Sequence, residues 1–156
     1  FQIMGDWAKG EFTAAGKKPG VDYYCAATPS NNGYLYNVDS FIFYKTSDPD
    51  KQEGQKLLAK LMMGKNFQKV FNLYKGSIPA RLDVPMDEFD KCAKTSNADI
   101  KTAGEKGGLV PSFAHGMAQG NTMKAALQDV ITEHFNSNMS SVDAANALAD
   151  SVLDNM

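Results

Sequence analysis

Apolar side chains recur every three or four residues over much of the chain beyond residue 47, a spacing that predicts amphipathic helices. The run Ser-Asp-Pro-Asp at residues 47–50 combines a capping residue with an early proline and predicts the start of the first such helix. Gly64 predicts its end, and Gly76 predicts the end of the next helix. We expect both helices to bury one face in the core, formed by Leu57, Leu58, Leu61, Met62, Phe67, Val70, Phe71 and Tyr74.

Further helices are predicted toward the end of the chain. A short helix over residues 87–95 carries Cys92, and Asn97 is expected to cap another short helix. A long helix ends near Phe135, and a final helix begins at the serine at 140 or 141. Their inward faces are expected to be Met123, Leu127, Val130, Ile131, His134, Ala145, Leu148, Ala149, Val152 and Leu153.

The first third of the chain has the composition of β-strands. Residues 1–4 are interpreted as the end of a buried strand, followed by a glycine turn and a short helix with Asp6 as its N-cap. This helix is predicted to run over residues 6–15. Residues 21–27 predict a second strand, and residues 34–44 predict one or two more.

Strong turn chemistry over residues 28–33 separates the predicted strands. Strands therefore cluster in the first half of the chain and helices dominate the second. The pattern predicts an α/β fold with few strands and one core, for which 156 residues are sufficient.

Charge and hydropathy exclude some classes of function. The net charge is −2 and the pI is near 5.6, so there is no surplus of basic residues to neutralise phosphates, and we expect no nucleic-acid partner. No run of about 18 apolar residues is present to cross a membrane. The chain opens in what we interpret as the middle of a strand, without a signal-peptide pattern, and is expected to be part of a longer protein.

Sequence motifs for catalysis or metal binding are absent. There is no Gly-x-Ser-x-Gly elbow, no phosphate-cradling loop and no His-Glu-x-x-His. Cys25 and Cys92 lie too far apart in sequence for metal-ligand spacing, and either one disulfide or two free thiols is possible. We therefore expect no catalytic residue, no metal and no cofactor, while a small enzyme built on Asp39 and His115 remains an alternative.

Four scattered residues remain as candidates for ligand binding: Trp7, Asp39, Lys75 and His115. Trp7 is either a core residue or an aromatic ring presented to a cleft. Asp39 either caps a nearby backbone or accepts hydrogen bonds from a ligand. One aromatic face with a few charged donors and acceptors suits a carbohydrate, which offers C–H faces for stacking and hydroxyls for hydrogen bonds.

Several stretches resemble one protein family: MGDWAKG at residues 4–10, NVDSF at 37–41, KGSIPARLD at 75–83, and the segment 109–118. The chain is similar over nearly its whole length to the C-terminal part of bacterial ABC-transporter extracellular sugar-binding proteins of the glucose/mannose type. The resemblance implies a two-lobed, type II periplasmic binding fold. Most of the chain would then belong to the C-terminal lobe, with a segment over roughly residues 34–80 that crosses to the other lobe.

The resemblance also implies roles for individual residues. Trp7 would be the stacking platform for a sugar ring, Asp39 would accept hydrogen bonds from sugar hydroxyls, and Lys75 and His115 would donate to them. Arg81 would brace the hinge region.

The partners implied are a monosaccharide such as glucose or mannose, a membrane permease, and the N-terminal lobe of the same protein. The location would be periplasmic or extracellular, an oxidising compartment that favours a disulfide between Cys25 and Cys92. A binder of the same fold for an oligosaccharide or a polyol is the alternative.

Overall fold

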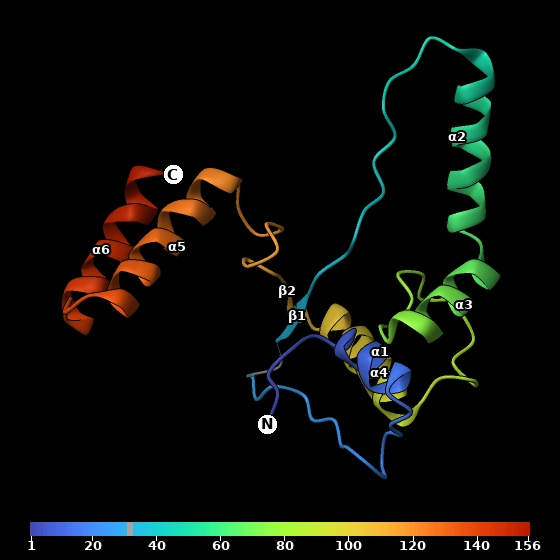
Figure 1. Cartoon of the computed structure of the whole chain (residues 1–156), viewed down its shortest axis with the longest axis horizontal. Coiled ribbons are helices and arrows are strands. Elements are labelled where there is room, and N and C mark those ends of the chain that lie inside the picture. Colours follow the sequence, from blue (N-terminus) through green and yellow to red (C-terminus); the bar gives the residue numbers. More distant parts are fainter. Residues whose placement is uncertain (31–32) are drawn as a thin grey trace. The chain divides into compact units, whose positions relative to one another are not determined.

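The computed structural model of the chain describes residues 1–30 and 33–156. Its helices and strands follow in the order shown in Figure 1: α1 (Ala8–Ala14), β1 (Tyr34–Tyr36), α2 (Pro49–Met62), α3 (Lys65–Lys75), α4 (Lys91–Glu105), β2 (Leu109–Pro111), α5 (Asn121–Asn136) and α6 (Ser141–Asp154). The chain divides into unit 1, residues 1–34 and 38–108, and unit 2, residues 35–37 and 109–156.

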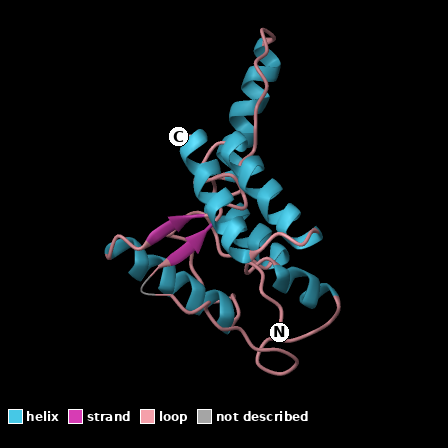
Figure 2. Cartoon of the chain, turned by 90° about the vertical axis from the view of Figure 1, so that its left-hand side faces the viewer, coloured by secondary structure: helices cyan, strands magenta, loops and turns pink. Residues whose placement is uncertain are grey.

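The helices dominate, and the strands form a single small sheet in the described part of the chain (Figure 2). The Tyr34 amide donates to the Gly108 carbonyl oxygen and the Ser112 amide donates to the Tyr36 carbonyl oxygen, each at 2.8 Å. This register makes β1 and β2 parallel neighbours. The prediction of few strands and many helices is therefore confirmed.

Local signals determine where α2 and α3 begin and end. The Asp48 carboxylate accepts hydrogen bonds from the Asp50 and Lys51 amides at the start of α2, and Pro49 occupies its first position. Gly64 stands between the two helices, and Gly76 ends α3 with a φ of 87°. These predicted boundaries are confirmed.

The core of unit 1 lies between the loop after α3 and the start of α4. Val84, Phe89 and Ala93 are buried, with Leu73, Ile78 and Met86 packed against them. In unit 2, α5 and α6 pack side by side (Figure 1), and each contributes one buried apolar side chain, Met123 and Ala144.

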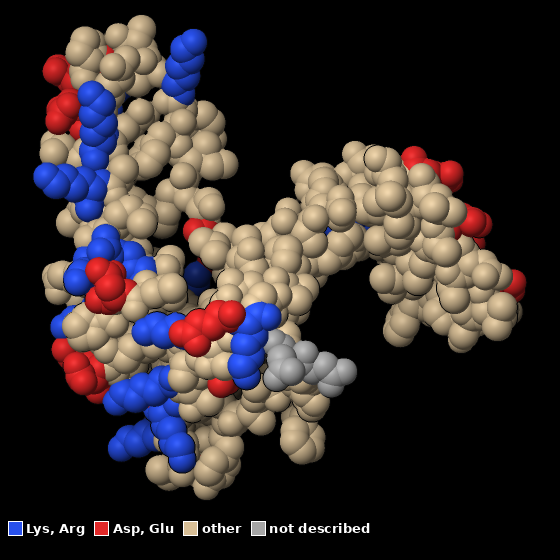
Figure 3. Space-filling view, turned by 180° about the vertical axis from the view of Figure 1, so that it is seen from behind, with Lys and Arg blue, Asp and Glu red and all other residues tan. Residues whose placement is uncertain are grey.

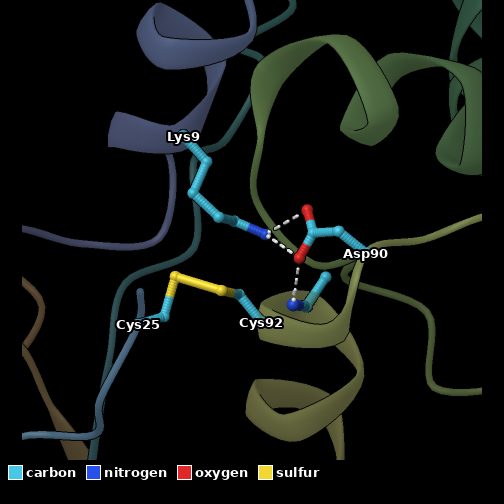
Figure 4. Close-up of a disulfide and its surroundings, with 5 residues drawn as sticks. Lys9, Cys25, Asp90 and Cys92 are labelled. Atoms are coloured by element: carbon cyan, nitrogen blue, oxygen red, sulfur yellow. Dashed lines mark hydrogen bonds and ion pairs between the residues drawn. A yellow bond between two sulfur atoms is a disulfide. The ribbon is translucent and has the colours of Figure 1, made fainter. Parts of the chain in front are cut away.

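Two connections meet at the first turn of α4 (Figure 4). The disulfide between Cys25 and Cys92 joins the loop after α1 to α4, which confirms the pairing that the resemblance implies. Two residues before Cys92, Asp90 makes the second connection. The buried Lys9 ammonium contacts both Asp90 carboxylate oxygens, at 3.2 and 3.0 Å. Asp90 also caps α4 by accepting a hydrogen bond from the Ala93 amide at 2.8 Å.

Asp90 is thus a half-buried structural partner, with a side chain that is 32% exposed. Glu88 pairs with Lys69 at 2.7 Å. The two short helices predicted over 87–95 and from Asn97 are one continuous helix, α4, because Asn97 lies in its interior and not at a cap.

Two predicted strands are wrong. Residues 1–4 are exposed and make no strand pairing, and residues 21–27 show only an isolated bridge between Pro19 and Tyr23. The strand predicted over 34–44 is limited to β1. A strand needs a hydrogen-bonded neighbour, which β-compatible composition alone does not supply. Part of the turn predicted over 28–33 falls on residues 31 and 32, outside the described residues.

The prediction that the apolar faces of α2 and α3 are core is wrong for most of their members. Met62 is buried, but the side chains exposed to solvent in these helices include Leu57, Leu58, Leu61, Val70, Phe71 and Tyr74. Ile131, Phe135 and Leu153 of unit 2 are exposed as well. Helical periodicity identifies an apolar face but not the surface that covers it.

Charged side chains of both signs are interspersed on unit 1, as Figure 3 shows for one face. Unit 2 carries five acidic side chains and a single lysine, Lys124. The net negative charge of the chain therefore comes from unit 2.

The disulfide is predicted to be a major source of stability. It closes a loop between residues 67 positions apart, which limits the unfolded chain and stabilises the fold by about 4 kcal/mol in the chain-entropy model. Replacement of Cys25 and Cys92 together by serine should lower the urea midpoint accordingly, measured by circular dichroism. An unchanged midpoint, or two alkylatable thiols in unreduced wild-type protein, would contradict the prediction.

Candidate functional site

Trp7 lies immediately before α1 and is partly buried. Its ring atoms Cε3, Cζ3 and Cη2 occupy the space where a Cβ at position 5 would stand, so the indole folds back over Gly5. Only glycine at position 5 leaves room for this arrangement. The MGDW sequence therefore sets the orientation of the ring through the close contact between Trp7 and Gly5.

The prediction that Asp6 caps α1 is wrong. The helix begins two residues later, and Trp7 occupies the N-cap position. The Asp6 carboxylate instead accepts a hydrogen bond from the Ile78 amide at 3.0 Å. Burial raises the pKa of Asp6 above its usual value, while the Ile78 amide and the charges of Lys9 and Lys75 act to lower the pKa. The charge of Lys75 therefore acts on the Asp6 carboxylate.

The backbones of α1 and α3 touch near the end of α3. A Cβ added at Gly10 would lie 2.6 Å from the Lys75 carbonyl oxygen, and one added at Gly76 would overlap with the Gly10 amide nitrogen. Two glycines facing each other therefore allow this approach. It brings the start of α1, with Trp7, to the end of α3, with Lys75.

Lys75 pairs with Asp39. The Lys75 ammonium donates to the Asp39 carboxylate, and the same ammonium lies 5.8 Å from the centre of the Phe71 ring, within the range of a cation–π interaction. Asp39 lies after β1 and its side chain is 62% exposed, against 30% for Lys75. The structure thus joins two candidate residues whose sequence positions are 36 residues apart.

His115 belongs to unit 2 and is described there. It is exposed, and its Nδ1 forms a hydrogen bond of 2.7 Å with the hydroxyl of Ser112, which is itself buried. The Ser112 amide donates to Tyr36 at the end of β1. The short sheet of β1 and β2 therefore anchors the loop that carries His115.

An open apolar hollow of about 690 Å³ lies along α3. Its lining residues are Phe67, Val70, Phe71, Tyr74 and Lys75, and the rings of Phe67 and Phe71 stack with centres 5.5 Å apart. Lys75 thus stands between an apolar surface on one side and Asp39 on the other.

Within the described part of the chain, no cluster of three or more His, Cys, Asp or Glu side chains is arranged to hold a metal ion. None of the helices there has the length and apolar character that a membrane crossing requires.

Comparison with known proteins confirms the resemblance. The chain is 47% identical to a probable sugar-binding periplasmic protein of Brucella suis and 42% identical to one of Rhizobium meliloti, in each case over 97% of this chain and 36% of the relative. It is 34% identical to an uncharacterized ABC transporter extracellular-binding protein of Pyrococcus horikoshii, over 98% of this chain and 34% of that protein. No family model matches the chain.

The chain therefore resembles the C-terminal part of longer proteins named as sugar-binding periplasmic proteins and as an ABC-transporter binding protein. It spans about a third of the length of the curated relatives it matches.

Sequence reasoning missed two residues that organise this region. Asp6 is predicted to cap a helix and Asp90 is not singled out by the sequence, yet Asp6 binds the Ile78 amide and Asp90 binds Lys9. An aspartate between glycine and tryptophan gives no local sign of a partner 72 residues away.

Gly5→Ala is predicted to displace the Trp7 ring, because the new methyl group would overlap with it. We expect a shift of the tryptophan emission maximum and a loss of roughly 1–3 kcal/mol of stability, measured by fluorescence and by thermal unfolding. Trp7 is the only tryptophan of the chain, so the emission reports this position alone.

Gly54→Ala is the matched control. Gly54 lies within α2 with open space where its Cβ would stand, so alanine should stabilise the helix by about 0.5–1 kcal/mol and leave the emission unchanged. If Gly5→Ala left both the emission and the stability unchanged, the ring would not lie over position 5.

Proposed function

We propose that this chain is the C-terminal part of the substrate-binding component of an ABC sugar importer, located in the periplasm. The protein would bind a monosaccharide such as glucose or mannose and deliver it to the membrane permease. The names of the Brucella and Rhizobium relatives support a sugar-binding role, and the name of the Pyrococcus relative supports a binding role in an ABC transporter. The observation that carries the proposal is the junction of α1 and α3, which gathers an aromatic ring at Trp7 and the charged pair of Lys75 and Asp39 in one unit.

These groups suit the recognition of a pyranose. The Trp7 ring would stack on the C–H face of the sugar. The Asp39 carboxylate would accept hydrogen bonds from two neighbouring hydroxyls, and the Lys75 ammonium would donate to a hydroxyl oxygen. The resemblance also implies that His115 donates a hydrogen bond to the sugar.

The remainder of the site would come from the upstream part of the protein. We propose a two-lobed, type II fold in which the segment of roughly residues 34–80 crosses to the N-terminal lobe and Arg81 braces the hinge region. The contacts of Arg81 with Asp83, at 2.8 and 2.7 Å, and with the Met63 carbonyl oxygen, at 3.2 Å, support such a role. Closure of the two lobes would enclose the sugar.

An oligosaccharide is the second candidate ligand, because the apolar hollow beside Lys75 exposes further aromatic rings. Tyr74 is 81% exposed and Phe71 lines the same hollow. A second sugar ring could stack there. Binding of a disaccharide at least ten times tighter than of its monosaccharide would favour this candidate. An enzyme is disfavoured, since the names of the relatives point to a binding protein.

Trp7→Ala in the longer protein is predicted to weaken sugar binding by about 10- to 100-fold, because burial of an aromatic face contributes roughly 1.5–3 kcal/mol. Calorimetry with glucose, galactose and mannose measures the effect. Phe135→Ala, which removes an exposed ring of unit 2, is the control and should leave the affinity unchanged. Unchanged affinity in Trp7→Ala would assign Trp7 to packing and remove the main support for the proposal.

The 156-residue chain alone is predicted to bind sugar weakly or not at all. Small-molecule sites enclose ~70–90% of their ligand, and this chain spans 36% of the length of its relatives. Loss of three or four hydrogen bonds, each contributing roughly 0.5–1.5 kcal/mol, would cost about one to four decades in affinity. Micromolar binding by the monomeric 156-residue chain in calorimetry would show that its site is complete.

A further inference from the structure

We propose that Asp6 is a positioning residue that fixes the Trp7 ring and the Lys75 ammonium relative to one another. The inference rests on the proposed function for what those two side chains bind. Asp6 precedes Trp7 directly, and its carboxylate accepts a hydrogen bond from Ile78, three residues after Lys75. One side chain therefore connects the two segments that carry the candidate ligands.

A second contact between the same segments lies on the other side of Trp7. The Gly10 backbone touches the backbone of Lys75 and Gly76, where a Cβ on either glycine would collide. One contact alone would let α1 rotate against the end of α3. Two contacts, at Asp6 and Gly10, hold both ends of the segment that contains Trp7, so its backbone is fixed against the end of α3.

The charged side chains around Asp6 indicate that its hydrogen bond to Ile78 has a structural role. Each lysine near Asp6 has a closer carboxylate partner, Lys9 in Asp90 and Lys75 in Asp39. Asp6 is therefore not required as the counter-ion of either lysine, and its carboxylate is bonded to the backbone instead, at Ile78 and at Trp7. Burial of a carboxylate is unfavourable and raises the pKa of Asp6. The hydrogen bonds that Asp6 accepts offset part of this desolvation free energy.

The experiment compares Asp6→Ala with Asp6→Asn in the 156-residue chain labelled with nitrogen-15 at isoleucine. Alanine removes the acceptor, while asparagine keeps a carbonyl oxygen that can accept from the same amide. In Asp6→Ala we expect the Ile78 amide to exchange at least about fivefold faster and the Trp7 emission to shift. In Asp6→Asn the Ile78 exchange rate should stay within about twofold of wild type, and the Trp7 emission maximum should match that of wild type.

Asp48→Ala is the matched control: it should lower the stability while the hydrogen bond between Asp6 and Ile78 stays in place. Asp48 also accepts backbone hydrogen bonds in unit 1, but it caps α2 and contacts neither segment of the site. It should lower the melting temperature and leave the Ile78 and Trp7 signals unchanged. Asp6→Ala with wild-type Ile78 exchange and wild-type emission, or the same changes in Asp48→Ala, would overturn the proposal.

Sugar affinity in the longer protein provides the functional readout. Asp6→Ala should weaken binding at least about tenfold and Asp6→Asn less than about threefold, with Asp48→Ala at wild-type affinity. If Trp7→Ala and Lys75→Ala both kept wild-type affinity, the proposed function would fail, and the Ile78 and Trp7 signals would still decide the role of Asp6. If those two variants lost affinity and Asp6→Ala did not, Asp6 would have no positioning role.

Discussion

The fold of unit 1 depends on the burial of one lysine. Lys9 is 5% exposed, and a charge removed from water to this extent needs a partner of opposite sign with good geometry. Asp90 supplies both carboxylate oxygens and at the same time caps α4, so the packing of α1 and the start of α4 are set by the same carboxylate. The disulfide at Cys92, two residues further on, adds a covalent connection at that turn. The N-terminal segment is thereby held in place without a strand.

The same fixed position of α1 is what allows the candidate site to form. Lys9 anchors α1 to α4 on one side, while the adjacent Gly10 contacts the end of α3 on another. The sequence MGDWAKG therefore contains, within seven residues, the contacts that place Trp7: a glycine under the ring, an aspartate to the Ile78 amide, a lysine to Asp90 and a glycine to Gly76. The resemblance was based on this stretch, and the structure shows a physical reason for each of these residue types.

Local chemistry was predictable and distant partners were not. Asp48, Pro49, Gly64 and Gly76 act through their own turns of backbone, so the boundaries of α2 and α3 followed from the sequence. Asp6 and Asp90 act through residues 72 and 81 positions away, which no local pattern identifies. The strand predicted over 21–27 failed for the same reason, because its aromatic and β-branched residues meet no neighbouring strand. The pairing of Asp39 with Lys75 was likewise invisible, although both residues were candidates.

Most of the apolar side chains of α2 and α3 are exposed although their spacing predicts a buried face. Their helical spacing is that of a buried face, yet Leu57, Leu61 and Tyr74 are each at least 60% exposed. Contiguous apolar surface of this kind typically marks a contact with another protein surface or with a ligand. The part of this surface on α3 lines the apolar hollow beside Lys75, so it adjoins the charged pair of Lys75 and Asp39.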